Sequence, residues 1–104
     1  GLDFPMQKGV EIRSVAKGVV KEVNFVNGYG KYIVLDHGDG YTTLYANNDN
    51  NLVKVGQKIE CDQVIALVGN SGENSTGPHL HFEVRYKGKA QDPRHFRVNK
   101  KTSS

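Results

Sequence analysis

The chain has 104 residues, a length at which a single domain is expected. Its 37% hydrophobic and 24% charged residues are typical of a folded soluble domain, and no apolar run approaches the roughly 18 residues of a membrane span, so no transmembrane segment is expected. The net charge of +3 suits an anionic partner without specifying one, and the lone Cys61 excludes both a disulfide framework and a multi-cysteine zinc site.

Short apolar segments separated by glycine-containing turns predict strands along most of the chain. The expected strands are residues 10–15, 19–26, 32–37, 41–46, 57–60, 64–69 and 80–87. Gly38-Asp39-Gly40 predicts a hairpin turn. Residues 47–51 are all Asn or Asp and predict a polar loop, and residues 70–78 predict a second loop.

The last expected strand gives the clearest indication of the fold. Its apolar residues alternate strictly with polar ones, and because side chains alternate across a strand, the apolar set should face the core. The apolar set is Leu80, Phe82, Val84 and Tyr86, and the polar set is His79, His81, Glu83 and Arg85. No segment has the periodicity of a long helix. We therefore predict an all-β domain of two packed, mostly antiparallel layers.

His79 and His81 are the first candidates for chemistry. Their spacing places both imidazoles on one face of a strand, about 6–7 Å apart. One ring can then ligate a metal while the other reaches a metal-bound water or a substrate, and zinc with His and Asp ligands and an open fourth position is the usual hydrolytic arrangement. The alternative is a pair of surface histidines on a solvated strand face.

The run Ser75-Thr76-Gly77-Pro78-His79-Leu80-His81-Phe82-Glu83-Val84 resembles the signature of the M23 metallopeptidases of the LytM or lysostaphin type. Further stretches follow the same family in order: Gly1-Leu2-Asp3-Phe4, residues 15–20, Gly28-Tyr29-Gly30, residues 37–41, Leu44-Tyr45-Ala46, Val55-Gly56-Gln57 and residues 88–93. The resemblance covers residues 1–98 and leaves 99–104 as a flexible tail. It implies a two-layer antiparallel barrel-sandwich of the LytM type, with the active site in a groove between loops.

The resemblance also implies roles for individual residues. The family cuts peptide bonds of peptidoglycan with one zinc ion. Asp3 matches the metal-binding Asp, His81 matches the second-motif zinc ligand, and His79 matches the catalytic histidine that helps to polarise water and stabilise the oxyanion. The implied mechanism is Lewis-acid activation of a zinc-bound water, followed by attack on an amide carbonyl.

Two departures from the family pattern weaken the implied chemistry. The first zinc-ligating histidine would lie two positions before Gly1, so the N-terminal edge of the domain is expected to be truncated and zinc binding to be weak or absent. Where active members read Tyr-Ala-His, this chain reads Tyr45-Ala46-Asn47. Asn47 takes the catalytic position and can donate a hydrogen bond, but it cannot titrate near neutral pH, and loss of such a group typically costs about 10²–10³ in rate.

The resulting hypothesis is a non-catalytic LytM-like domain of cell-wall remodelling. It would bind peptidoglycan peptides, or a partner hydrolase or paralogue as a heterodimer, in the periplasmic or extracellular cell envelope. The first alternative is a zinc-dependent peptidoglycan endopeptidase. The second is a biotinyl- or lipoyl-like carrier domain, suggested by residues 54–59 and 64–68, although residues 70–78 contain no lysine to carry the group. Nucleic-acid binding is not expected, since no RNP-like or zinc-finger pattern is present.

Several other residues have plain structural interpretations. His37 is expected to be a turn or strand-end residue, and Cys61 a semi-buried structural thiol. Four tyrosines either line a groove or fill the core: Tyr29, Tyr32, Tyr41 and Tyr45.

Overall fold

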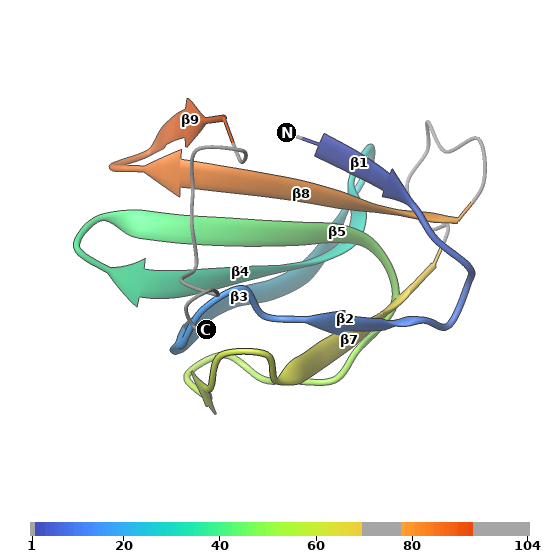
Figure 1. Cartoon of the computed structure of the whole chain (residues 1–104), viewed down its shortest axis with the longest axis horizontal. Helices are drawn as coiled ribbons and strands as arrows, with labels where there is room; N and C mark the ends of the chain where they lie inside the picture. Colours follow the sequence, from blue (N-terminus) through green and yellow to red (C-terminus); the bar gives the residue numbers. More distant parts are fainter. Residues whose placement is uncertain (1, 70–77, 93–104) are drawn as a thin grey trace.

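The computed structural model describes residues 2–69 and 78–92. All the secondary-structure elements within these ranges are β-strands (Figure 1). The strands are β1 (Leu2–Pro5), β2 (Glu11–Arg13), β3 (Gly18–Val26), β4 (Gly30–Gly38), β5 (Tyr41–Asn51), β6 (Lys58–Ile59), β7 (Val64–Val68), β8 (His79–Tyr86) and β9 (Lys89–Gln91). All their pairings are antiparallel. The all-β prediction is confirmed, and the described residues contain no helix that could span a membrane.

The main sheet has the strand order β1-β8-β5-β4-β3-β6. The outer edge of β8 is shared by two short strands, β1 along its first half and β9 along its second half. The long strand β5 pairs with β4 and β8 and then, near its end, with β7, which itself pairs with β2. The sheet therefore curls, and β2 and β7 form a smaller second layer beside the main strands (Figure 1).

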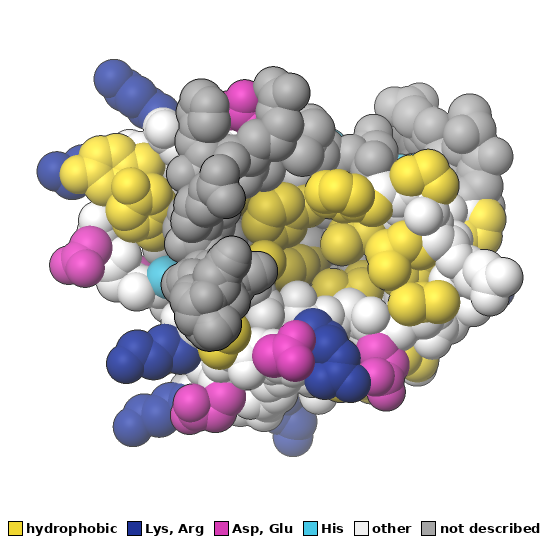
Figure 2. Space-filling view, viewed as in Figure 1, with side chains coloured by type: hydrophobic (Ala, Val, Ile, Leu, Met, Phe, Trp, Pro, Cys, Tyr) yellow, Lys and Arg dark blue, Asp and Glu magenta, His cyan; other side chains and the backbone are white. Residues whose placement is uncertain are grey.

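The core lies between these two layers, and Figure 2, in the orientation of Figure 1, shows a group of apolar side chains in the middle of the molecule. The main sheet contributes Val20, Ile33, Leu35, Tyr45, Ile59, Phe82 and Val84, and β2, β7 and the segment before β6 contribute Ile12, Val53, Ile65, Ala66 and Val68. Phe82 and Val84 are buried and Leu80 packs partly buried against the cluster, as the alternation in β8 predicts. Tyr86, at the end of β8, is only half-buried, and its ring packs against that of Tyr41 with the centroids 4.8 Å apart. The two-layer antiparallel prediction is confirmed.

The predicted polar loop at residues 47–51 is wrong, because these residues are the end of β5. They pair with β7, with Asn48 opposite Val68 and Asn51 opposite Ala66. The side-chain Nδ2 of this buried Asn48 donates to the Tyr45 carbonyl (3.0 Å) and to Oδ1 of Asn51 (2.7 Å), so both of its amide hydrogens are used inside the fold. A bulge between Asn48 and Asn50, together with a left-handed φ of 69° at Asn47, turns β5 from one layer into the other.

Two strands were not expected from the sequence, β1 and β9, and both are short. Each pairs only with β8, so each depends on that strand for its hydrogen bonds. Of the second predicted loop, residues 70–77 lie outside the described residues, as does the predicted tail at 99–104.

Candidate functional site

The face of the main sheet that points away from the core carries the polar residues of β8. The strand register places Glu83 opposite Leu44, Leu44 opposite Val34, and Val34 opposite Glu22, so these side chains form one row across β8, β5, β4 and β3. Two parallel rows flank it, one of His81, Ala46, Tyr32 and Asn24, and one of Arg85, Thr42 and Asp36. The polar side chains of β8 are therefore part of a surface to which four strands contribute.

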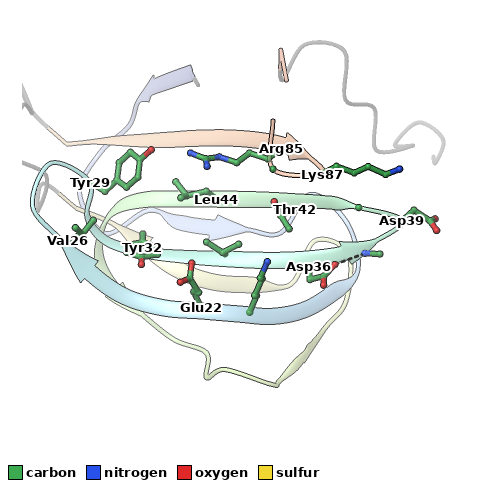
Figure 3. A pocket seen from close by; sticks show the side chains of 15 residues that line it. Glu22, Val26, Tyr29, Tyr32, Asp36, Asp39, Thr42, Leu44, Arg85 and Lys87 are labelled. Carbon is green, nitrogen blue, oxygen red and sulfur yellow. Dashed lines mark hydrogen bonds between the residues drawn. The ribbon is translucent and has the colours of Figure 1, made fainter. Parts of the chain in front are cut away.

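A groove of about 730 Å³ follows this face (Figure 3). Val34 and Leu44, paired across β4 and β5, give it an apolar floor. Tyr29 and Tyr32 stand at one end (Figure 3). Six charged side chains are among its lining residues: Lys21, Glu22, Asp36, Asp39, Arg85 and Lys87. An apolar floor with aromatic and charged walls is the character of a site that binds a peptide or a protein segment.

Glu83 is the centre of a hydrogen-bond network at the tyrosine end of the groove. Its Oε2 accepts hydrogen bonds from the Tyr29 hydroxyl (2.6 Å) and from Nε2 of His81 (2.8 Å). Its Oε1 accepts from Nη2 (2.8 Å) and Nε (3.2 Å) of Arg85. The Tyr29 ring stacks on the His81 ring, with the centroids 5.3 Å apart and the planes at 28°. Tyr29, His81 and Glu83 thus contact one another pairwise, and the position of each ring is fixed.

The charge state of Glu83 follows from these contacts. Burial favours the neutral acid and would raise its pKa, but the hydrogen bonds from Tyr29, His81 and Arg85 and the nearby guanidinium outweigh burial and lower the pKa to about 2. The same hydrogen bond to Glu83 raises the pKa of the Tyr29 hydroxyl. Glu83 is therefore ionised at neutral pH. Because an ionised carboxylate can only accept, Nε2 of His81 carries a proton, and Nδ1 is the nitrogen with ligand capacity.

Asn47 and His79 meet at the junction of β5, β7 and β8. Asn47 is 2% exposed, and its Nδ2 donates to the carbonyls of Gly69 (2.8 Å) and His79 (2.7 Å). The same nitrogen lies 3.3 Å from Nδ1 of His79. The two residues predicted as catalytic are thus in contact, through Nδ2 of Asn47 and the carbonyl and ring of His79.

The donor chemistry at His81 suits zinc. Metal-ligating histidines commonly donate their second ring N–H to a carboxylate, as His81 does to Glu83. In the register of β1 and β8, Asp3 is the direct backbone partner of His81. Among the side chains that the structure describes, which begin at Phe4, no group of three His, Cys, Asp or Glu could hold a metal. Zinc binding and the ligand roles of Asp3 and His81 stay predictions.

The other residues singled out in the sequence fall into structural places. His37 lies near the end of β4, with Nδ1 2.7 Å from the Lys17 carbonyl and Nε2 2.6 Å from Oγ1 of Thr43, which agrees with a strand-end role. Cys61 is exposed in the turn between β6 and β7 and not semi-buried as expected.

Three of the four tyrosines take one of the two expected roles, whereas Tyr41 is exposed outside the groove and packs against Tyr86. Tyr29 and Tyr32 line the groove, and Tyr45 is buried in the core. Sequence reasoning assigned no role to Glu83 or Arg85, although both stand on the polar face of β8 in the same alternation as the two histidines. The alternation in β8 could therefore have indicated that Glu83 and Arg85 lie on the same face as the two histidines.

The comparison with known proteins decides the family. The sequence model of Peptidase family M23 matches residues 1–93. The chain belongs to peptidase family M23. Among curated relatives, the murein hydrolase activator NlpD of Escherichia coli (strain K12) is 44% identical over 94 residues, which cover 89% of this chain and 24% of NlpD. The chain thus spans about a quarter of that relative's length.

Solved M23 structures share the fold closely. A zinc-containing peptidase from Vibrio cholerae superposes with a TM-score of 0.88 and 38% identity over 93% of this chain and 30% of that chain. The catalytic domain of lysostaphin from Staphylococcus simulans gives a TM-score of 0.84 and 34% identity over 90% of this chain and 74% of that chain. The predicted LytM-type M23 fold is confirmed, and the carrier-domain alternative is set aside.

Proposed function

We propose that this M23 domain acts in peptidoglycan remodelling by binding a murein hydrolase and raising its activity, without cleaving peptidoglycan itself. The observation that carries the proposal is a contrast between the groove and the position of the family's catalytic histidine. The groove is fully built across four strands, whereas the position of the family's catalytic histidine is taken by Asn47, whose amide is engaged by main-chain carbonyls. The similarity to NlpD, a protein named as a murein hydrolase activator, supports the same role.

The groove is suited to recognition. Val34 and Leu44 offer an apolar floor, Tyr29 and Tyr32 offer aromatic faces, and Arg85 offers a guanidinium held in place by Glu83. Aromatic and arginine side chains in a pocket are the usual centres of binding energy in protein interfaces. Because the Glu83 network fixes these groups before a partner arrives, less conformational entropy is lost on binding.

The partner is a cell-wall hydrolase or a paralogue with the full catalytic set, and the place of action is the cell envelope, periplasmic or extracellular. Peptidoglycan peptides are the second class of ligand for the same groove. A groove that holds a segment of a partner protein can also hold a peptide of the cell wall. The similarity to NlpD favours the hydrolase.

The alternative is a zinc-dependent peptidoglycan endopeptidase, favoured by the juxtaposition of His79, His81 and the backbone of Asp3, and by the likeness to the zinc-containing peptidase of Vibrio cholerae. Zinc, when bound, would supply Lewis-acid activation of water. His81 and Asp3 would hold the metal, Glu83 would orient His81, and His79 would hydrogen-bond the substrate.

The test is a dye-release assay on labelled peptidoglycan. The domain is added alone, and then with each purified murein hydrolase of the same organism. We expect no release by the domain alone and acceleration of one hydrolase. Val34→Lys places a long charged side chain on the groove floor and should abolish the acceleration. Val55→Lys makes the same change at a residue that is 63% exposed and does not line the groove, and should leave it intact.

Two results would contradict the proposal. Dye release by the domain alone, lost on chelation and in His81→Ala, would establish the endopeptidase instead. Equal acceleration by the Val34→Lys and Val55→Lys variants would show that a hydrolase is recognised away from the groove.

A further inference from the structure

We infer that Asn47 is a positioning residue: its side-chain amide ties the end of β7 to the start of β8 and thereby fixes the position of His79. The inference deepens the proposed function, and it rests on that function only for its last measurement. It differs from the catalytic role that the family pattern implies, in which a side chain at this position would stabilise an oxyanion.

The first argument is the use of the amide hydrogens. Nδ2 of Asn47 has two hydrogens, and the carbonyls of Gly69 and His79 accept at 2.8 Å and 2.7 Å. Carbonyl oxygens can only accept, so the orientation of the amide is settled: the flipped amide would place Oδ1 against two other oxygens. Both hydrogens are therefore spent on the protein's own backbone, and the third contact, 3.3 Å to Nδ1 of His79, adds the imidazole to the same junction.

The second argument is the main chain of Asn47. Its N–H donates to the carbonyl of Tyr29 (2.8 Å), and its carbonyl accepts from the N–H of Gly69 (3.1 Å). Asn47 therefore connects β5 to the turn after β3, to the residue that follows β7, and to the first residue of β8. Its φ of 69° is in the left-handed region, which asparagine tolerates better than most residues other than glycine.

The third argument is the tightness of the junction. A Cβ at Gly69 would lie 2.4 Å from the backbone nitrogen of Asp49, so β5 and the end of β7 are in backbone contact there. With 2% of its surface exposed, Asn47 is almost fully enclosed by the protein. An amide that donates inward from such a site cannot also donate to a developing oxyanion. Its effect on the site passes through His79, whose carbonyl and ring it holds.

The test needs variants that separate the amide from the backbone. Asn47→Asp keeps the size and the tolerance of positive φ but replaces the donor with an acceptor. Asn47→Gly removes the side chain and adopts φ of 69° without strain. Asn48→Ala is the matched control: Asn48 is also a buried, hydrogen-bonded asparagine of β5, but its amide donates to Tyr45 and Asn51 and not to His79.

The first readout is NMR, which is independent of any partner. In the unmodified domain we expect couplings across the hydrogen bonds from Nδ2 of Asn47 to the carbonyl carbons of Gly69 and His79, and their absence would overturn the inference even if no variant folds. In the folded Asn47 variants, the His79 resonances should shift and broaden while those of Val84, in the core part of β8, stay in place. In Asn48→Ala the His79 resonances should stay in place. Unchanged His79 resonances in Asn47→Gly would overturn the inference.

The second readout is the stimulation of a murein hydrolase, measured below the unfolding temperature of every variant. The domain concentration for half-maximal stimulation should rise about tenfold in Asn47→Gly and Asn47→Asp, the size expected for losing one or two buried hydrogen bonds that hold a binding group, and less than about twofold in Asn48→Ala. A loss of stimulation with undisturbed His79 resonances would mean that Asn47 touches the partner directly, and would overturn the inference. If the unmodified domain stimulates no hydrolase, the proposed function fails and the NMR readout alone decides the role of Asn47.

Discussion

Replacing Tyr45 with phenylalanine should reveal a buried hydroxyl that stabilises the domain at neutral pH and destabilises it in alkali. The residue is 1% exposed in the core. Its hydroxyl accepts the N–H of Val15 (3.1 Å) and a hydrogen bond from Oγ1 of Thr43 (3.0 Å). Tyr45→Phe keeps the ring but leaves these buried donors without their partner. The expected cost is about 1–3 kcal/mol of unfolding free energy at pH 7.

The alkaline effect has the opposite sign. Burial raises the pKa of Tyr45 to about 12 from the ordinary 10, although the hydrogen bonds from Thr43 and Val15 lower it in part. Between these values the unfolded chain loses the phenolic proton first, so stability falls as pH rises. At about 1.36 kcal/mol per pKa unit, the loss is about 1.4 kcal/mol by pH 11 and approaches a limit of about 2.7 kcal/mol. The phenylalanine variant lacks this loss.

Urea unfolding of both proteins at pH 7 and pH 11 measures the two effects together. The stability gap between the unmodified protein and Tyr45→Phe should narrow by about 1.4 kcal/mol at the higher pH. A gap of the same size at both pH values would refute the reasoning. Tyr86→Phe is the control: the Tyr86 hydroxyl makes no hydrogen bond to a described residue, and its removal should cost less than about 0.5 kcal/mol at pH 7.

Three further outcomes are expected. Gly69→Ala should lower the unfolding free energy by about 3 kcal/mol or more, because the new Cβ would lie 2.4 Å from the Asp49 nitrogen. In the control Gly88→Ala the new Cβ meets no atom within 4 Å, and the strained φ alone should cost roughly 1–2 kcal/mol. The urea midpoints of the two variants distinguish these costs. Tyr29→Phe should cost about 1.5–3 kcal/mol, because it removes a 2.6 Å hydrogen bond to an ionised carboxylate, and Tyr32→Phe, whose hydroxyl bonds no described residue, should cost less than about 0.5 kcal/mol; equal costs would contradict the network. After dialysis of the 104-residue chain against a mild chelator, elemental analysis should find well below one zinc per chain, and a stoichiometric amount would contradict this.

The face of β8 was predictable because alternation is a local property. Phe82 and Val84 were expected to face the core because the polar residues that alternate with them point to the opposite face, and the motif around His79 and His81 then located the site. The alternation could not predict which contacts the other polar residues of β8 make. Glu83 and Arg85 look like an ordinary solvated pair until Tyr29, from a distant turn, is brought against them.

The segment 47–51 was misjudged for a related reason. Runs of Asn and Asp favour loops because their side chains compete for backbone hydrogen bonds, and Asn48 does bond a nearby carbonyl, that of Tyr45. The partners that make the segment a strand, Val68 and Ala66, belong to β7 and are fixed only by the curling of the sheet. In the same way, the sequence shows that Asn47 is not a histidine, but not where its N–H groups point.

The sharing of the β8 edge between β1 and β9 has a consequence for how the domain assembles. β9 follows β8 after a two-residue turn and can pair with it at once, whereas almost the whole described chain separates β1 from the same strand. Closing so long a loop is slow, and pairings of this range are generally formed after the local hairpins. The backbone edge at residues 79–82 would therefore be the last to be covered and, while open, would be the part of the nascent sheet most prone to pair with another chain.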